Sequence, residues 1–211
     1  MSRTSSRRRG KSTKGKSVDR WALKKFYNIV SPENIGSGQK IGETIADDPD
    51  KLHGRTIEVP LSDITQDYSK IHFKLKFQVN GVIGDTATTQ FRGHSFANDY
   101  LRFLVRRRRT RIDGVFDVRT TDEQLIRVTV TAFTTHRAKT SQKYAIRAIM
   151  KKVVNKKAQE LSFKEFIDEI IYGKLGSEVY SECKKIFPLK RVEVQKSKVL
   201  SRLTIKTNQN Q

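Results

Sequence analysis

The chain has 211 residues, of which 43 are Lys or Arg and 22 are Asp or Glu, so its formal net charge at pH 7 is +21. A hydrophobic content of 36% is enough for a buried core in one large domain or two small ones. No apolar run reaches the roughly 18 residues of a membrane span, and the single cysteine, Cys183, excludes an intramolecular disulfide framework. These properties favour an intracellular basic protein without a membrane anchor, whose leading partner is nucleic acid.

The N-terminal seventeen residues carry seven basic side chains and no acidic one. After Met1 this stretch has no apolar residue, and its like charges repel, so we expect residues 1–20 to form a disordered extension that orders on a polyanion. Residues 10–17 fit the P-loop formula, but the hydrophobic strand that must precede such a loop is missing. The basic residues predicted to contact RNA here are Arg3, Arg7, Arg8, Arg9, Lys11, Lys14 and Lys16.

Residues 21–54 are predicted to wrap a surface before the core begins. Apolar anchors, among them Trp21 and Phe26, are followed over residues 31–54 by a Pro- and Gly-bearing stretch that is typical of a loop. Residues 55–200 then form a single predicted α+β domain, and residues 201–211 a polar tail.

The first half of this domain has the two-residue alternation of β-strands. Residues 55–61 predict an edge strand because Pro60 cannot donate to a ladder. Residues 71–79 predict the clearest strand, Asn80-Gly81 predicts a tight hairpin turn, and residues 86–91 predict the returning strand.

The second half mixes helices with further strands. Residues 95–109 predict a helix with its apolar stripe on Phe96, Tyr100, Phe103 and Leu104. A hairpin is predicted from residues 112–119 and 125–133, and a basic amphipathic helix from residues 141–158. Two more helices and a final strand are expected at residues 162–172, 177–186 and 190–199.

Basic side chains gather again in the folded part of the sequence. The run 106–109 consists of four arginines, and residues 137–157 contain eight Lys and Arg with no acid. Arginine can clamp a phosphate with its planar fork and stack on bases. The residues predicted to neutralise RNA phosphates are Arg106, Arg107, Arg108, Arg109, Arg111, Lys139, Lys143, Arg147, Lys151 and Lys152. The acidic stretch 158–182 is expected to face solvent or a basic neighbouring protein.

Catalytic and metal chemistry find little support. The four histidines lie in separate segments, and none has another His or Cys183 at ligand spacing, so we expect no metal, cofactor or catalytic residue. Six phenylalanines lie on apolar stripes and are predicted to be core residues rather than base-stacking platforms: Phe73, Phe77, Phe96, Phe103, Phe133 and Phe166.

A series of short motifs, spread from Trp21 to Val199, resembles the archaeal and eukaryotic small-subunit ribosomal protein family usually called S-three-a or S-one-e. The most specific are Leu52-His53-Gly54-Arg55-Thr56-Ile57-Glu58-Val59, Phe91-Arg92-Gly93, Val118-Arg119-Thr120-Thr121-Asp122, Lys139-Thr140-Ser141 and Ile186-Phe187-Pro188-Leu189. The chain stops soon after Val199, which favours an archaeal source, since eukaryotic members are usually longer there.

This resemblance implies an antiparallel β-barrel-like core flanked by helices. It also implies a non-enzymatic constituent of the cytoplasmic ribosome, on the platform of the small subunit near the messenger exit. Small-subunit ribosomal RNA and neighbouring ribosomal proteins would be the partners, with contact to messenger RNA near the exit as an open alternative. Two other classes remain: a free RNA chaperone or architectural nucleic-acid-binding protein, which would bind unrelated RNAs equally well, and an RNA-modifying enzyme, which would need a convergent acid/base pair.

Overall fold

The computed structural model describes residues 21–32, 35 and 38–200. The basic extension and the polar tail lie outside these residues, so the expectations for them are not addressed by the structure. Five α-helices, two short 3-10 helices and eight β-strands are found in the described part, which makes the fold α+β as expected.

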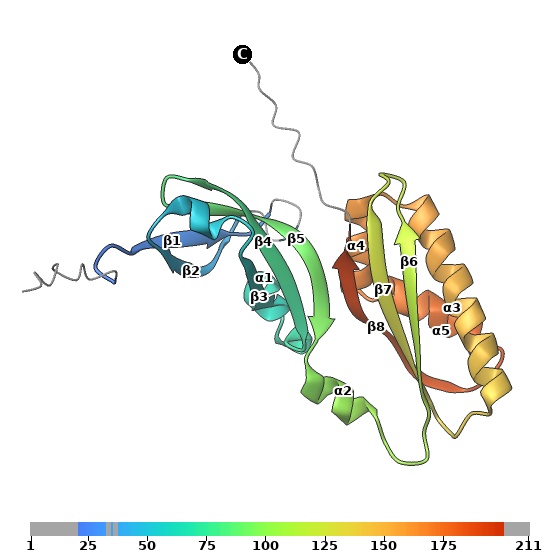
Figure 1. The fold of residues 1–211 in the computed structure, drawn as a ribbon. Coiled ribbons are helices and arrows are strands. Elements are labelled where there is room, and N and C mark those ends of the chain that lie inside the picture. The colour runs from blue at the N-terminus through green and yellow to red at the C-terminus, as the bar shows by residue number, and fades with distance from the viewer. Residues whose placement is uncertain (1–20, 33–34, 36–37, 201–211) are drawn as a thin grey trace, which may run out of the picture.

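A mixed sheet of eight strands runs through the whole described molecule (Figure 1). The N-terminal lobe contains β1 (Lys25–Val30), β2 (Lys40–Ala46), β3 (Thr56–Pro60), β4 (Phe73–Ile83) and β5 (Thr86–Phe96). The C-terminal lobe contains β6 (Arg111–Arg119), β7 (Leu125–Thr134) and β8 (Leu189–Val199). α2 (Asn98–Leu104) leads from one lobe to the other (Figure 1).

Strand β5 joins the two lobes. It pairs with β4 along its length, while its other edge is divided between β1, which is parallel to it, and β8, which is antiparallel. Among the described strands β2 and β6 end the path and do not pair with each other, so the sheet is open and the expected barrel does not close. The sheet does not close because one edge of β5 pairs first with β1 and then, further along the strand, with β8. This change of partner divides the sheet between two lobes.

The helices cover one face of the C-terminal lobe (Figure 1). They are α3 (Thr140–Glu160), α4 (Phe163–Ile171) and α5 (Lys174–Cys183). Alternate residues of β6, β7 and β8 point into a core with them, and this core includes Ile112, Val128, Met150 and Phe166. Three strands with one apolar face cannot exclude water from it alone, so the amphipathic helices provide the second layer.

The N-terminal lobe has two smaller cores. In the first, α1 (Leu61–Thr65), part of α4 and strands β3 to β5 enclose Leu75 and Phe77. In the second, Tyr27 and Ile29 of β1 pack beside Leu52 of the 3-10 helix η1 (Pro49–Leu52). The other 3-10 helix, η2 (Tyr68–Lys70), precedes β4.

Several sequence predictions are confirmed and others are wrong. The hairpin of β6 and β7, the three C-terminal helices and the final strand lie close to their expected bounds. Asn80 and Gly81 do not form the turn: β4 passes through them with a register shift, and the chain turns at Gly84 and Asp85. Burial of Val82 against the second core extends the strand beyond the first available turn.

Two further corrections concern residues near the N-terminus and the first helix. The expected loop over 31–54 contains β2, which β1 recruits by a backbone ladder that no local pattern reveals. The expected helix 95–109 shortens to α2 because Ser95 and Phe96 remain in β5, where Phe96 packs edge-on against Phe73 at 4.5 Å between ring centroids. With the helix so placed, Phe103 is 65% exposed, whereas the other five predicted core phenylalanines are buried.

Candidate RNA-binding surface

The predicted RNA-binding residues of the described part occupy two loops, the start of one strand and one helix. The run Arg106–Arg109 lies in the connection between α2 and β6, and Arg111 begins β6. Lys139 directly precedes α3, on which the remaining four lie.

The α2–β6 loop and the β7–α3 loop are held together by Thr110 and Thr134. The Thr110 backbone N–H donates to Thr134 Oγ1 at 2.8 Å, and the Thr134 N–H donates to the Thr110 carbonyl at 3.0 Å. The Ala138 N–H donates to Thr110 Oγ1 at 3.1 Å. Two basic segments that are 25 to 30 residues apart in sequence therefore meet at one end of the β6–β7 hairpin, around a hollow of about 720 Å³ that Arg108, Arg109 and Arg137 line.

Strand β8 adds two more cations at the same end. The register places Arg111 opposite Phe133 on β7, and Phe133 opposite Arg191 on β8. Repulsion from Arg109 is the main reason why the pKa of Lys190 lies below its usual value, with burial and the charges of Arg106 and Arg191 adding to it. We call this cluster the basic hairpin end; it consists of Arg106, Arg108, Arg109, Arg111, Arg137, Lys190 and Arg191.

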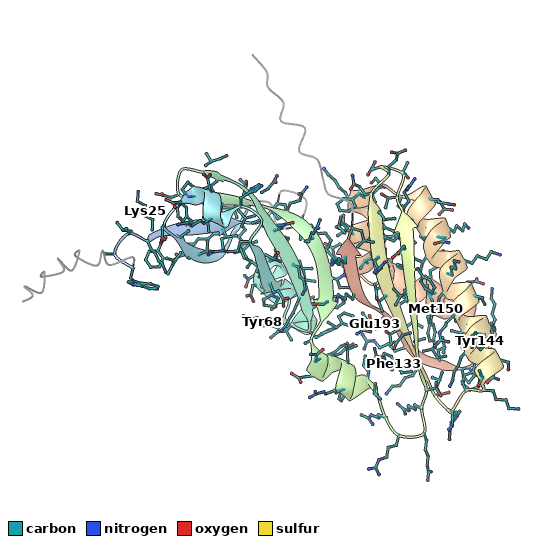
Figure 2. The ribbon with its side chains drawn as sticks, viewed as in Figure 1. Lys25, Tyr68, Phe133, Tyr144, Met150 and Glu193 are labelled. Atoms are coloured by element: carbon teal, nitrogen blue, oxygen red, sulfur yellow. The ribbon has the colours of Figure 1, made fainter. Side chains whose placement is uncertain are left out.

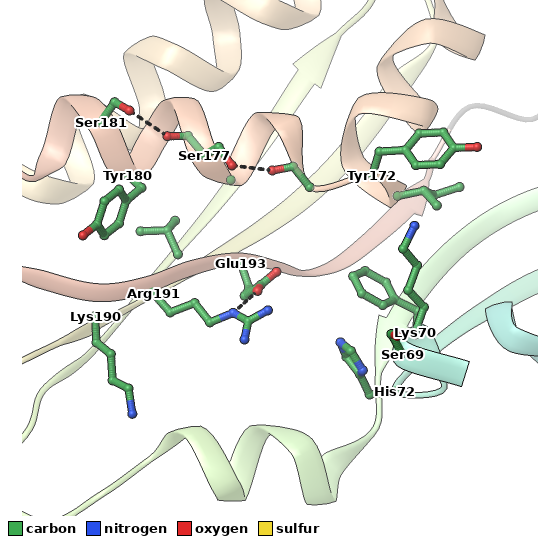
Figure 3. A pocket seen from close by; sticks show the side chains of 15 residues that line it. Ser69, Lys70, His72, Tyr172, Ser177, Tyr180, Ser181, Lys190, Arg191 and Glu193 are labelled. Atoms are coloured by element: carbon green, nitrogen blue, oxygen red, sulfur yellow. Dashed lines mark hydrogen bonds and ion pairs between the residues drawn. The ribbon is translucent and has the colours of Figure 1, made fainter. Parts of the chain in front are cut away.

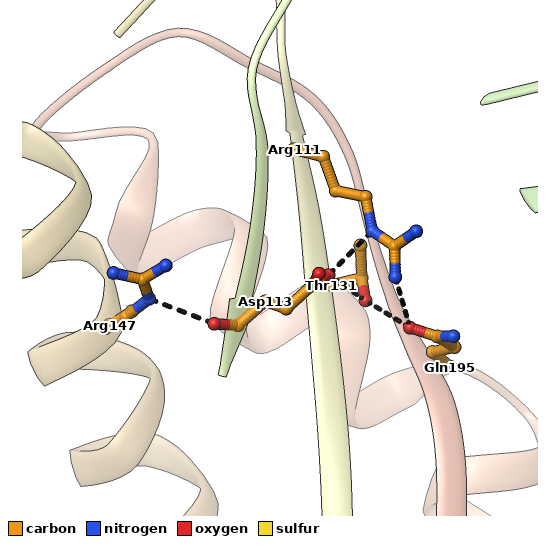
Figure 4. Close-up of polar contacts among 5 residues, drawn as sticks. All are labelled: Arg111, Asp113, Thr131, Arg147 and Gln195. Carbon is orange, nitrogen blue, oxygen red and sulfur yellow. Dashed lines mark hydrogen bonds and ion pairs between the residues drawn. The ribbon is translucent and has the colours of Figure 1, made fainter. Parts of the chain in front are cut away.

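Acidic side chains neutralise only part of this cluster. Arg111 donates to Asp113 at 2.8 Å and to Gln195 at 2.9 Å (Figure 4), and Arg191 forms an ion pair with Glu193. In contrast, Nη1 of Arg109 is buried and has no hydrogen-bond partner among the described residues. A buried guanidinium nitrogen without an acceptor costs free energy, which adds to the cost of gathering these charges.

Helix α3 presents its basic residues beside its apolar stripe. Ile146, Met150 and Val154 are buried, and Lys151 is exposed. Tyr144 is on the outer face of the helix (Figure 2). Lys139 and Lys152 are also exposed, and neither forms an ion pair within the described chain.

Arg147 differs from the other basic residues of α3 because it also has a structural role. Its Nε donates to the backbone carbonyl of Asp113 at 2.9 Å and so ties α3 to β6 (Figure 4). The position of Arg147 in the helical sequence pattern does not reveal whether its side chain binds the protein backbone or a phosphate.

The acidic stretch is partly neutralised within the protein. Lys157 of α3 approaches Glu178 of α5 at 3.1 Å and Glu169 of α4 at 3.8 Å. These carboxylates hold the pKa of Lys157 above its usual value, chiefly through the hydrogen bond to Glu178. These ion pairs link α3, α4 and α5, and they neutralise part of the charge of the acidic stretch within the protein.

Besides this basic surface, the described residues include a single cysteine and several side chains of the types that bind metals. Cys183 is buried, and burial, followed by the nearby Glu182, raises the pKa of its thiol to about 11, so it remains protonated. Within residues 21–32, 35 and 38–200, no three His, Cys, Asp or Glu side chains are grouped to hold a metal ion.

Comparison with known proteins places this chain in a family. The model of the Ribosomal S3Ae family matches residues 12–202. The chain belongs to this family. It is 47% identical over 182 residues to the small ribosomal subunit protein eS1 of Desulfurococcus amylolyticus, covering 86% of this chain and 85% of the relative. It is 44% identical over 196 residues to the eS1 protein of Methanococcus vannielii, covering 92% and 89%.

Another similar protein, the eS1 of Aeropyrum pernix, is 46% identical over 186 residues, with 86% of each chain covered. These relatives are archaeal, in agreement with the expected source. Among the described helices, none is long and apolar enough to cross a membrane.

The sequence predicted the runs of this surface but not how they combine. Lys190 and Arg191 were not among the residues predicted to bind RNA, and only the pairing of β8 with β7 brings them beside the run 106–109. One feature of the sequence could have indicated this proximity. A strand at residues 190–199 needs a neighbouring strand for its backbone hydrogen bonds, and the predicted hairpin offers one.

Proposed function

We propose that this chain is a structural, non-catalytic constituent of the small ribosomal subunit in the cytoplasm, where it binds ribosomal RNA on the platform near the messenger exit. Membership of the Ribosomal S3Ae family and similarity to archaeal small ribosomal subunit proteins eS1 support this role. Neighbouring ribosomal proteins would be further partners, and messenger RNA at the exit remains an open one.

The observation that carries the RNA interface is the basic hairpin end. There the fold gathers cations from three segments against their mutual repulsion and leaves Nη1 of Arg109 without a partner. Phosphate groups satisfy both conditions, because they neutralise charge and accept hydrogen bonds from the arginine fork. The cations of α3, including Lys143, Lys151 and Lys152, would extend the contact along the RNA, and the N-terminal extension would add a contact that is largely indifferent to sequence.

The test compares two double variants of the full-length chain. The first, Arg106→Gln with Arg109→Gln, removes two cations of the basic hairpin end. The matched control, Lys40→Gln with Lys51→Gln, removes two exposed lysines of the N-terminal lobe that already pair with Glu43 and Asp48. Both variants lose the same net charge, so any difference between them reports position.

Affinity is measured over a range of salt concentrations for a small-subunit platform fragment and for an unrelated RNA of equal length. We expect the first variant to weaken platform binding and to lower the slope of log affinity against log salt by about one for each lost phosphate contact. The control should change both quantities much less. Equal weakening by the two variants would reject the interface, and equal affinity of the wild type for both RNAs would favour a free RNA chaperone.

A further inference from the structure

A second basic region of the molecule is a cleft of about 620 Å³ between the two lobes (Figure 3). On one side lie η2 and the beginning of β4, and on the other lie the end of α4, helix α5 and the first residues of β8. It adjoins the basic hairpin end through Lys190 and Arg191, but its remaining lining residues are different. Neither the sequence predictions nor the family match assigns a ligand to it.

Aromatic rings and cations alternate around this cleft. Tyr172, at the end of α4, is 61% exposed, and Lys70 Nζ lies 4.8 Å from the centroid of its ring. Tyr180 of α5 lies further along the same wall (Figure 3). An exposed tyrosine beside lysine and arginine is the combination with which proteins hold unpaired nucleotides, because the ring stacks on a base while the cations meet its phosphates.

Polar groups without partners lie on the opposite side. His72 lines the cleft and stacks on Tyr100, with ring centroids 3.9 Å apart. Within the described chain, His72 Nε2 and the Tyr100 hydroxyl are buried without hydrogen-bond partners. Burial, followed by the charge of Arg191, lowers the pKa of His72, so the neutral form of the ring is favoured on this side of the cleft.

Two serines add further acceptors. Ser177 donates its hydroxyl proton to the Gly173 carbonyl at 3.3 Å, and Ser181 donates to the Ser177 carbonyl at 3.1 Å. Their oxygen lone pairs therefore remain available to a hydroxyl donor such as a ribose 2′-OH. An acidic peptide would engage the cations of the cleft but would leave these aromatic and hydroxyl groups unused.

We propose that this cleft binds a short unpaired stretch of RNA, with one base against Tyr172 and the backbone phosphates that follow it near Arg191 and Lys190 at the other end of the cleft (Figure 3). The proposal rests on the proposed function in one respect, namely that RNA is the partner. The nucleotide at Tyr172 would come either from ribosomal RNA or from messenger RNA, since both offer the same chemistry.

The test uses the full-length chain and fluorescent single-stranded hexaribonucleotides with or without a base at one central position. Tyr172→Ala should weaken binding of the intact oligonucleotide about tenfold, because base stacking on an aromatic side chain is lost. It should change binding of the abasic oligonucleotide less than about twofold, since no base is there to stack. Tyr144→Ala is the matched control: Tyr144 is 66% exposed on α3, outside the cleft. Lys190→Gln should weaken both oligonucleotides, because the phosphate is common to them.

Assembled small subunits carrying Tyr172→Ala identify the source of the nucleotide. If the nucleotide belongs to ribosomal RNA, its base should become more reactive to chemical probes than in wild-type subunits. If it belongs to messenger RNA, 4-thiouridine in the messenger should cross-link to the peptide around position 172 in wild-type subunits but not in the variant. If neither changes, or if Tyr172→Ala and Tyr144→Ala behave alike, the cleft proposal is wrong. If the arginine variants of the basic hairpin end still weaken platform binding as expected, the proposed function stands without the cleft. If the wild type instead binds platform RNA and unrelated RNA equally, while Tyr172→Ala still weakens oligonucleotide binding, the cleft proposal stands and the proposed function fails.

Discussion

At the scale of single residues, His94 shows how a polar group is accommodated in the core. It is fully buried, with Nε2 at 2.9 Å from the Val194 carbonyl and Nδ1 at 2.6 Å from Ser197 Oγ. A carbonyl can only accept, so Nε2 carries the proton and Nδ1 accepts from the serine hydroxyl. The same serine oxygen accepts from the His94 backbone N–H at 3.2 Å, which completes the network between β5 and β8.

This arrangement predicts a loss of stability in mild acid. Burial lowers the pKa of His94 to about 4, although the bond to Val194 acts in the opposite direction. As the pH falls below about 6.5 the unfolded chain takes up the proton first, so stability is retained above that pH and lost between about 6.5 and 4. The loss attributable to His94 should be on the order of 3 kcal/mol at the lower end.

Urea unfolding at pH 7 and pH 4.5 measures this loss. His94→Gln should be less stable at pH 7 but should show a smaller decrease between the two pH values, while the exposed His53→Gln should keep the wild-type decrease. An imidazole NMR signal of His94 that titrates near pH 6.5 would contradict the assignment.

At the scale of elements, the contact between β5 and β8 depends on a residue without a side chain. A Cβ on Gly93 would lie 2.2 Å from the Ser197 carbonyl oxygen and 3.2 Å from the Lys198 Cα, both of which are backbone atoms that cannot rotate away. The three pairs of this junction, at residues 93–95 and 196–198, are the ladder that connects the lobes. Glycine is therefore required by the close approach of two strands.

Gly93→Ala should consequently destabilise the protein by at least about 1–3 kcal/mol, the usual cost of overpacking a tight site. Gly42→Ala provides the matched control, because Gly42 also lies in a strand but a Cβ there meets no atom within 4 Å. Equilibrium unfolding in urea should show a clear decrease for the first variant and little or none for the second. Similar midpoints for the two would show that β5 and β8 can separate without cost.

Helix α4 shows an element whose limits were predictable from local chemistry. Glu165 accepts a hydrogen bond from the Ser162 backbone N–H at 3.1 Å, as the Ser-x-x-Glu pattern predicts, and a second one from the Ser162 hydroxyl at 2.9 Å. The tertiary structure adds what the pattern omits: Asp122, from the β6–β7 turn, accepts from the Phe163 N–H at 2.7 Å. The helix start is thus fixed both by its own residues and by a neighbouring turn.

At the scale of the whole molecule, basic charge opposes folding of the isolated chain and favours assembly with a polyanion. The first seventeen residues contribute seven cations and no acid, while the basic hairpin end holds cations close enough to lower the pKa of Lys190. Counterion release on binding RNA relieves both costs, which is why affinity should depend steeply on salt.

Deletion of residues 1–17 should therefore weaken RNA binding and reduce the salt dependence of log affinity. The folded part should keep its thermal transition, because the core residues of all three clusters lie beyond the deletion. Binding titrations at several salt concentrations, together with thermal unfolding monitored by circular dichroism, measure the two effects separately. A salt slope equal to that of the full chain would show that the extension makes no phosphate contacts.

Much of this protein follows from its sequence because the responsible forces are local. Net charge, the period-two strands, the amphipathic α3 and the Ser162 cap all depend on residues within a few positions of one another. The family motifs likewise required no coordinates, and the match to the Ribosomal S3Ae family confirms them.

Only the tertiary structure decided how these parts meet, because backbone pairing between distant strands leaves little trace in local patterns. The parallel contact of β1 with β5, the division of β5 between β1 and β8, and the approach of Lys190 to Arg109 are of this kind. The sequence by itself determined that the chain is a basic α+β protein of this family. The long-range ladders determined that its sheet stays open, which cations share one surface, and that a tyrosine-lined cleft lies between the lobes.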